Sequence, residues 1–159
     1  MRKTLINQSV ENNPFPELNF LDLKHLAQVE FTSEHLEHPV ESALLLMEEA
    51  GTGWQAATSG EQTIRIVFDQ PRTIEHILLV FDEPHQSRTQ EFVLLWLADN
   101  EDCYREILRQ QYHFSPPNTT REIEHYEVKL TQVRALELRI IPDIGGGEAC
   151  AKLKQLRLA

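Results

Sequence analysis

Apolar and polar residues alternate along much of this chain. The clearest case is residues 64–68, where Ile64, Ile66 and Phe68 are apolar while Arg65 is polar. A period of two predicts a β-strand with one buried face. Pro71 interrupts the pattern, and proline donates no hydrogen bond to a sheet, so we expect a turn at residues 69–72. A second strand is predicted over residues 73–81, which makes this strand pair the centre of the fold.

Further strands are predicted at residues 26–32, 89–98, 104–112, 123–130, 136–141 and 151–158, with turn-forming residues between them. One helix is predicted, over residues 39–50. Pro39 suits its first position, and Gly51 suits the position just past its end. About eight short strands and one short helix indicate an all-β protein and argue against a fold of alternating strands and helices. The architecture that we predict is an antiparallel β-sandwich of jelly-roll type.

We divide the chain into an N-terminal arm, residues 1–19, and one sandwich domain, residues 20–159. The arm is polar, and it is either a free tail or a strap anchored by Phe15, Phe20 and Leu21.

Two predicted strands, residues 77–81 and 92–97, are apolar on both faces, so their outer faces need cover. We favour cover by the chain itself. The alternative is a homodimer through the face that carries Val93, Leu95 and Leu97.

Length and charge narrow the function. The 159 residues suit one domain, and the formal net charge is −10, with 15 basic against 25 acidic residues. Proteins that hold a phosphate backbone cluster Lys and Arg, so this balance argues against nucleic acid and anionic membranes. No segment resembles a membrane span or a secretory signal. The two cysteines form no CxxC pattern, which is typical of free thiols in a reducing compartment, and we expect a cytoplasmic protein.

The order of parts supports a more specific interpretation. A strand, a serine-containing loop, a proline-started helix and a GxxW motif are followed by GEQTIRIVFDQPRTIEHI. This series resembles the discoidin or coagulation-factor C-type domains and the wider galactose-binding-like jelly rolls. ALELRIIPD and ACAKLKQLRLA look like that family's paired C-terminal strands. Residues 38–80 are also similar to the N-terminal domain of the X-ray repair cross-complementing scaffold proteins, a protein-interaction and DNA-break-binding module. The resemblance covers residues 20–159 and implies ligand binding by loops at one end of the sandwich.

The chain departs from that family at the calcium loop. Many members hold Ca²⁺ there, whereas the matching positions here contain Glu48 and Glu49. Calcium takes six to eight oxygens, and neighbouring helical glutamates point in different directions, so we expect no metal and no cofactor. A metal near these two glutamates stays open. Secreted members often clamp their termini with a disulfide, but the arm has no cysteine to pair with Cys150, which agrees with an intracellular protein.

Two loops are candidates for ligand contact. Residues 82–88 join two buried strands and carry polar groups, and residues 112–118 place aromatic rings beside polar groups on a proline-stiffened loop. The alternative for each is a solvated hairpin loop. The predicted ligand-binding residues are His85, Arg88, Tyr112, His113, Phe114 and Asn118.

Other residues receive structural interpretations. Trp54 is predicted to be a core residue. His35 and His38 match no zinc-hydrolase spacing and are interpreted as loop histidines. His76 and His125 lie on separate predicted strands, and the sequence does not show whether they meet.

The sequence therefore predicts a non-catalytic recognition module that binds a carbohydrate or a similar polar ligand. The alternative is an intracellular protein-interaction scaffold of the repair-scaffold kind. An enzyme is less favoured, because no nucleophile or acid-base motif such as GxSxG is present.

Overall fold

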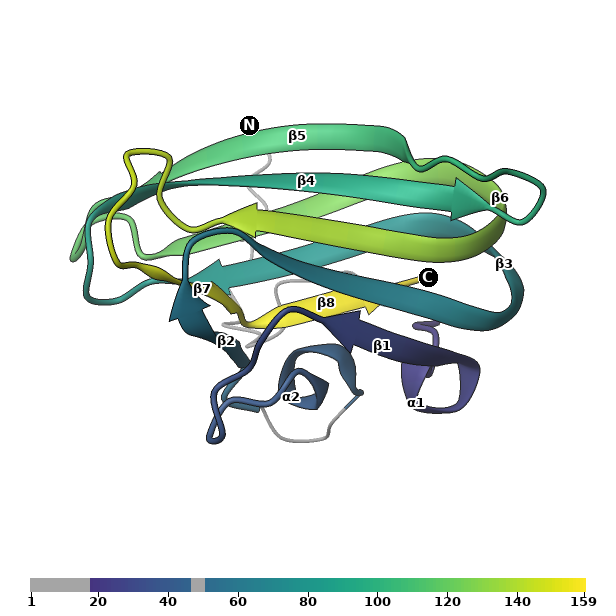
Figure 1. The fold of residues 1–159 in the computed structure, drawn as a ribbon, viewed down its shortest axis with the longest axis horizontal. Helices are drawn as coiled ribbons and strands as arrows, with labels where there is room; N and C mark the ends of the chain where they lie inside the picture. The colour runs from purple at the N-terminus through teal and green to yellow at the C-terminus, as the bar shows by residue number, and fades with distance from the viewer. Residues whose placement is uncertain (1–17, 47–50) are drawn as a thin grey trace, which may run out of the picture.

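The computed structural model describes residues 18–46 and 51–159, and within them the chain forms an antiparallel β-sandwich with two one-turn helices (Figure 1). The predicted all-β architecture is confirmed. The elements are α1 (Leu23–Leu26), β1 (Ala27–Phe31), α2 (Glu41–Leu44), β2 (Trp54–Ser59), β3 (Gln62–Asp82), β4 (Arg88–Ala98), β5 (Arg105–Phe114), β6 (Arg121–Ile141), β7 (Cys150–Leu153) and β8 (Gln155–Leu158).

Two strands of 21 residues, β3 and β6, belong to both layers. In the first layer, Ile64 pairs with Leu138, and the strand order is β1-β3-β6-β4-β5. In the second layer, Ile77 pairs with Tyr126 on one side and with Leu158 of β8 on the other. The layers pack face to face, as the stacked rings of Phe81 and Phe92 show, with centroids 5.2 Å apart. A further strand pair, β2 and β7, closes one end of the sandwich (Figure 1).

The chain doubles back at residues 69–72, as predicted, but no loop separates the two strands, because β3 runs unbroken through this corner (Figure 1). The pairing of β3 with β6 shifts register between Val67 and His76, which is where the strand passes from one layer to the other. A residue left unpaired at a β-bulge does not need its N–H, so proline is tolerated there.

Two other boundaries differ from the predictions. The expected break at residues 131–132 lies inside β6, where Gln132 takes a positive φ of 55°. Residues 151–158 form two strands in place of one. Residues 54–59, for which no strand was predicted, form β2.

The predicted helix at residues 39–50 is too long. Helix α2 is a single turn, and Leu45 is already extended. Burial of Val40, Ala43 and Leu44 holds this turn in place, and the Val40 amide at its start donates to the Glu34 carboxylate over 2.9 Å. Glu48 and Glu49 lie outside the described residues, so the predictions about a metal there stay untested.

The outer face of the second layer is covered by the chain itself. Leu78 and Val80 pack against Leu18 and Phe20, and the Leu21 amide donates to the Leu158 carbonyl oxygen over 2.8 Å. Residues 18–21 therefore lie across this face of the sheet. The rest of the arm, with Phe15, lies outside the described residues, so the choice between a tail and a strap stays a prediction.

On β4, Val93 and Leu97 are buried and Leu95 is half-buried, so little apolar surface remains for the predicted homodimer, which stays a prediction. None of the described helices has the length and apolar character to cross a membrane.

Candidate functional site

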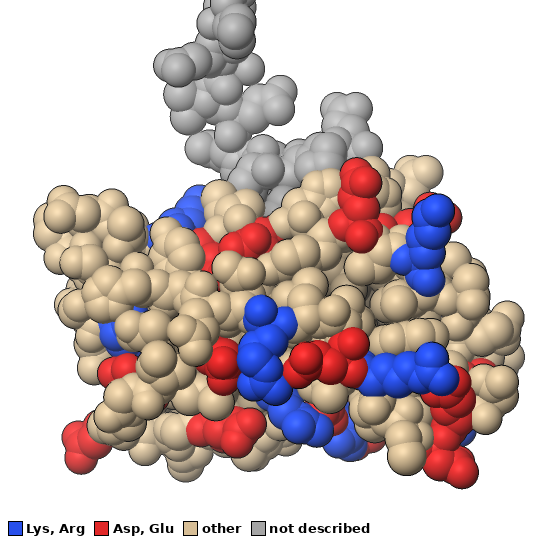
Figure 2. Space-filling model, turned by 90° about the horizontal axis from the view of Figure 1, so that it is seen from above, with Lys and Arg blue, Asp and Glu red and all other residues tan. Residues whose placement is uncertain are grey.

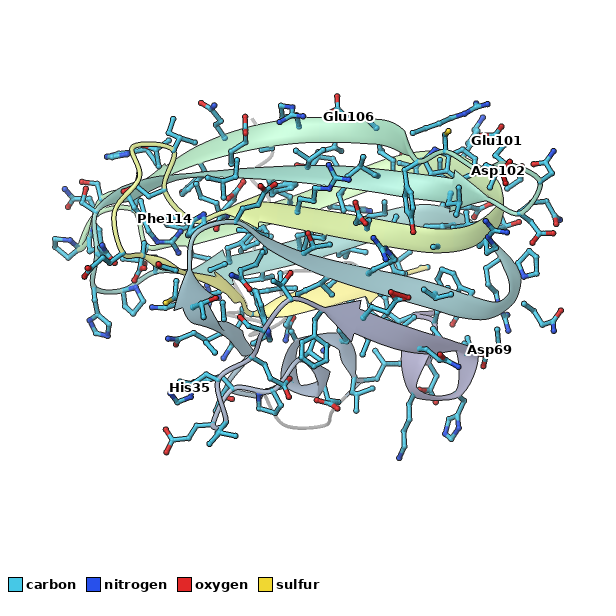
Figure 3. All side chains as sticks on the ribbon, in the orientation of Figure 1. His35, Asp69, Glu101, Asp102, Glu106 and Phe114 are labelled. Atoms are coloured by element: carbon cyan, nitrogen blue, oxygen red, sulfur yellow. The ribbon has the colours of Figure 1, made fainter. Side chains whose placement is uncertain are left out.

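Three connecting segments meet at one end of the sandwich, on the left in Figure 1. The Glu83 amide donates to the Thr120 carbonyl oxygen over 2.7 Å, and the Ser87 hydroxyl donates to the Phe114 carbonyl oxygen over 3.2 Å. Arg88 joins the third segment through the Pro142 carbonyl oxygen at 2.7 Å. Figure 3 places Phe114 at this end and Glu101 and Asp102 at the opposite end. The first predicted ligand loop and the second therefore lie side by side.

A cavity of about 320 Å³ opens beside the first of these loops. This volume falls at the small end of the range for small-molecule sites. Trp54 and Leu153 form its apolar floor, and Trp54 is only 1% exposed, with its indole Nε1 donating to the Ser33 carbonyl oxygen over 3.0 Å. The predicted core position of Trp54 is confirmed. The polar lining residues are His38, Thr52, Gln55, Asp82, His85, Lys152 and Lys154.

Positive charge dominates the polar lining. Asp82 is neutralised by Arg121, whose Nε and Nη2 donate to the two carboxylate oxygens over 2.7 and 3.2 Å. Lys154 donates to the Gly51 carbonyl oxygen over 2.6 Å, which fixes its position without cancelling its charge. Lys152 lies 3.4 Å from the Glu83 carboxylate. The cavity therefore offers ammonium and imidazole groups to a ligand rich in oxygen atoms.

The buried carboxylate of Glu83 fixes the conformation of the first ligand loop, residues 82–88. Glu83 is 1% exposed, and its carboxylate accepts from the amides of His85 and Gln86 at 3.2 and 3.4 Å and from Arg88 Nε at 2.8 Å. Burial favours the neutral acid, but the Arg88 and His85 hydrogen bonds and the charge of Lys152 outweigh it, so the pKa of Glu83 lies below its ordinary value. An ionised carboxylate thus pins the segment that carries His85.

Arg88 and Phe114, both predicted ligand contacts, support the loops from inside. Arg88 is 2% exposed and Phe114 is fully buried, and the guanidinium carbon lies 4.9 Å from the centre of the Phe114 ring. In addition to Glu83 and Pro142, Arg88 contacts the Gln90 side-chain oxygen at 3.4 Å. Burial leaves neither side chain a surface for a ligand, which corrects the expectation that they contact one directly.

Of the other predicted residues, only His85 lines the cavity. Tyr112 is half-buried, and its hydroxyl donates to the Arg121 carbonyl oxygen over 2.9 Å. His113 is exposed, with Nδ1 2.8 Å from the Thr89 hydroxyl, and Asn118 is an exposed member of the turn at residues 115–119. They form a neighbouring surface outside the cavity.

Sequence reasoning did not find Lys152 or Lys154. They lie between the buried residues Ala151, Leu153 and Leu156 in the last predicted strand. The alternation of these lysines with apolar residues indicates that the last predicted strand has one polar face. The pairing of β2 with β7 is needed to show that this face lies beside the first ligand loop.

Two groups of histidine and glutamate side chains come close enough to hold a metal ion, counting only the described residues. One consists of His35, Glu37 and His38 in the loop before α2, with His38 also lining the cavity. The other consists of His76, His125 and Glu127, on the strands of the second layer.

No family model and no curated protein matches this sequence. Solved structures do match it in fold. A family 32 carbohydrate-binding module of AlyQ, in complex with 4,5-unsaturated mannuronic acid, has a TM-score of 0.62 at 15% identity, covering 89% of this chain and 98% of that one. The family 32 module of NanJ from C. perfringens, in complex with galactose, has a TM-score of 0.62 at 12% identity, with coverages of 87% and 96%.

A chain in the structure of reduced XRCC1 bound to the DNA polymerase β catalytic domain matches equally well. Its TM-score is 0.61 at 12% identity, with coverages of 89% and 98%. The resemblance to galactose-binding-like jelly rolls and to the repair scaffold is therefore confirmed for the fold. At these identities the activity and the ligand do not follow from the fold.

Proposed function

We propose that this protein is a non-catalytic carbohydrate-recognition module whose ligand occupies the cavity beside the first ligand loop. The observation that carries this proposal is the convergence of His85, Lys152 and Lys154 over the apolar floor formed by Trp54 and Leu153. A few placed polar groups above an apolar surface are typical of small-ligand sites. Similar domains in complex with galactose and with an unsaturated mannuronic acid support the choice of carbohydrate. On the sequence grounds above, we place the protein in the cytoplasm.

The charges of the cavity favour a saccharide with a carboxylate. Two ammonium groups face the cavity, and the acid on its wall, Asp82, is already paired with Arg121. A uronate would form charge-assisted hydrogen bonds with the lysines, and these are stronger than bonds to neutral hydroxyls. Because Trp54 is only 1% exposed, it offers little ring surface for stacking, so the polar contacts carry the selectivity.

Calorimetry with trigalacturonic acid and with neutral galactotriose tests this proposal. We expect the acidic sugar to bind more tightly, and we expect His85→Ala to weaken its binding about 2- to 10-fold, the loss of one hydrogen bond. The matched control is His113→Ala, an exposed histidine at the same end but outside the cavity. Absence of saccharide binding, or a loss produced by His113→Ala in place of His85→Ala, would contradict the cavity as the site.

A protein-interaction scaffold is the second candidate, and an exposed apolar side chain favours it. Leu36 is 98% exposed in the loop before α2, and Ile144 is 49% exposed in the loop after β6. Long-range attraction to a nucleic acid has less support. On the face shown in Figure 2, Lys and Arg side chains are interleaved with Asp and Glu, so neither sign of charge is concentrated there.

The variant Leu36→Asp tests the protein-interaction alternative. It should reduce partner capture in a pull-down while leaving saccharide binding unchanged.

A further inference from the structure

Two histidine rings from different strands face each other on the outer face of the second layer. His76 Nδ1 on β3 lies 2.9 Å from His125 Nε2 on β6, and the ring centres are 5.1 Å apart. Glu127 completes the group, since one ligand atom from each of the three side chains lies within 4.8 Å of the others. None of these residues belongs to the carbohydrate cavity.

Strand pairing produces this grouping. His76 pairs directly with Glu127, and His125 precedes Glu127 by two positions on β6, so the two share one face of the strand. His125 pairs with Leu78, a residue of the outer face, which places all three side chains outside the core. Backbone hydrogen bonds between these two paired strands therefore hold the three side chains together.

We propose that His76, His125 and Glu127 bind a divalent transition-metal ion of the zinc type. Two imidazole nitrogens and a carboxylate oxygen are ligands that zinc commonly takes, with water in the fourth position. Tetrahedral coordination at ordinary Zn–N lengths separates two ligand nitrogens by about 3.3 Å, so the rings move apart by only a few tenths of an ångström. His125 and Glu127 are exposed and His76 is half-buried, which leaves room for that adjustment.

The surroundings favour a cation. An open hollow beside the group is lined by Glu75, His76, Glu127, Val128 and Lys129. Glu75 adds a second carboxylate, whereas Lys129 opposes a positive ion. The formal net charge of −10 adds a general attraction for cations. A hydrogen bond between the rings accounts for their contact without metal, but it gives Glu127 no part in the group.

The loop group of His35, Glu37 and His38 is a weaker candidate. His35 Nδ1 already accepts the Glu37 amide at 3.1 Å, and all three side chains come from one loop outside the named strands. It has the same composition as the proposed site, two histidines and one glutamate, so it serves as the matched control.

The test is a calorimetric titration of the full chain, without a histidine tag and stripped of metal, with Zn²⁺ alone. We expect one equivalent to bind through the strand site. His125→Asn should weaken binding by about 10- to 100-fold, and Glu127→Gln by less, while the double variant H35Q/H38Q retains the wild-type affinity. Circular dichroism establishes that each variant is folded, which the exposure of the changed side chains favours.

Co²⁺ absorption provides a second measurement, because the intensity of its d–d bands reports low coordination number, and we expect these bands to disappear in His125→Asn. Zinc should also raise the melting temperature of the wild type and not of His125→Asn, since a ligand that binds the folded state stabilises it. Absence of saturable Zn²⁺ binding, or loss of it in H35Q/H38Q in place of His125→Asn, overturns the proposal. Saccharide binding is a separate readout, so the two proposals fail independently.

Discussion

Two buried glutamates on the same strand, Glu137 and Glu122 of β6, are each 1% exposed and yet have opposite surroundings. Glu137, in the first layer, accepts from Arg65 Nε at 2.9 Å and Nη2 at 2.6 Å through one oxygen, and from Arg139 Nε at 2.8 Å through the other. Glu122, in the second layer, accepts one hydrogen bond from the described residues, from the Gln90 side-chain amide at 3.3 Å. Its second oxygen has no hydrogen-bond partner among the described residues.

The two glutamates differ because their neighbouring arginines pair with different carboxylates. Arg65 and Arg139 lie over Glu137 on the outer face of the sheet, with their far ends in water. Arg88, the nearest cation to Glu122 in the interior, is already bound to Glu83. Burial, followed by repulsion from Glu124, therefore raises the pKa of Glu122 to about 8. One interior cation thus stabilises the charged form of the loop acid Glu83 and leaves Glu122 neutral near pH 7.

Removal of Arg88 should have the largest effect. Arg88→Met leaves the buried Glu83 with Lys152, at 3.4 Å, as its one cation among the described residues, and breaking a buried pair in this way costs about 3–5 kcal/mol of unfolding free energy. Urea denaturation measures the change. The control is Arg105→Met at the exposed pair with Glu101, where we expect at most about 1 kcal/mol. Equal losses in the two variants would contradict the structural role of Arg88.

Glu122→Gln should make stability less dependent on pH. The folded protein keeps the Glu122 proton up to about pH 8, whereas the unfolded carboxyl releases it near its ordinary value of 4.5. Over that interval the folded state binds more protons, so wild-type stability falls as pH rises. The variant has no proton to lose, and it should be the more stable protein at pH 8–9 and equal to wild type below pH 4. The test is to measure the unfolding free energies of both proteins across this pH range. Parallel curves of stability against pH would contradict the raised pKa of Glu122.

Removal of Arg65 should have a smaller effect than removal of Arg88, because Arg139 remains bound to Glu137. Arg65→Met takes away two hydrogen bonds to a charged group, and we expect a loss of about 2 kcal/mol. A double-mutant cycle with Glu137→Gln isolates the pair, and its coupling energy should be close to the single loss. A coupling energy near zero would show that Glu137 relies on Arg139 alone.

Much of the fold follows from the alternation of apolar and polar residues, but strand continuity does not. Residues 64–68 and 77–81 were recognised as strands. Pro71 marks the corner where the chain doubles back, but its missing N–H does not show that one strand continues through that corner. The same pattern contained unused information about Arg88, which shares the parity of Gln90 and Phe92 on β4 and therefore points inward with them.

The cavity was only partly predictable. His85 was identified from the polarity of its loop, whereas Lys152 and Lys154 depend on how distant strands pair. The contact of His76 with His125 likewise depends on the register of β3 against β6, which the sequence pattern of either strand alone does not contain.

The passage of β3 and β6 through both layers has a consequence for how the protein opens. Because the same two strands pair with each other in both sheets, one sheet has no route to separate while the other stays intact (Figure 1). The amide protons of residues 64–67 and 77–81 should therefore exchange with deuterium at one common slow rate, that of unfolding of the whole domain. Since these strands pair across a long stretch of chain, assembly of that centre should also be the slow event in refolding.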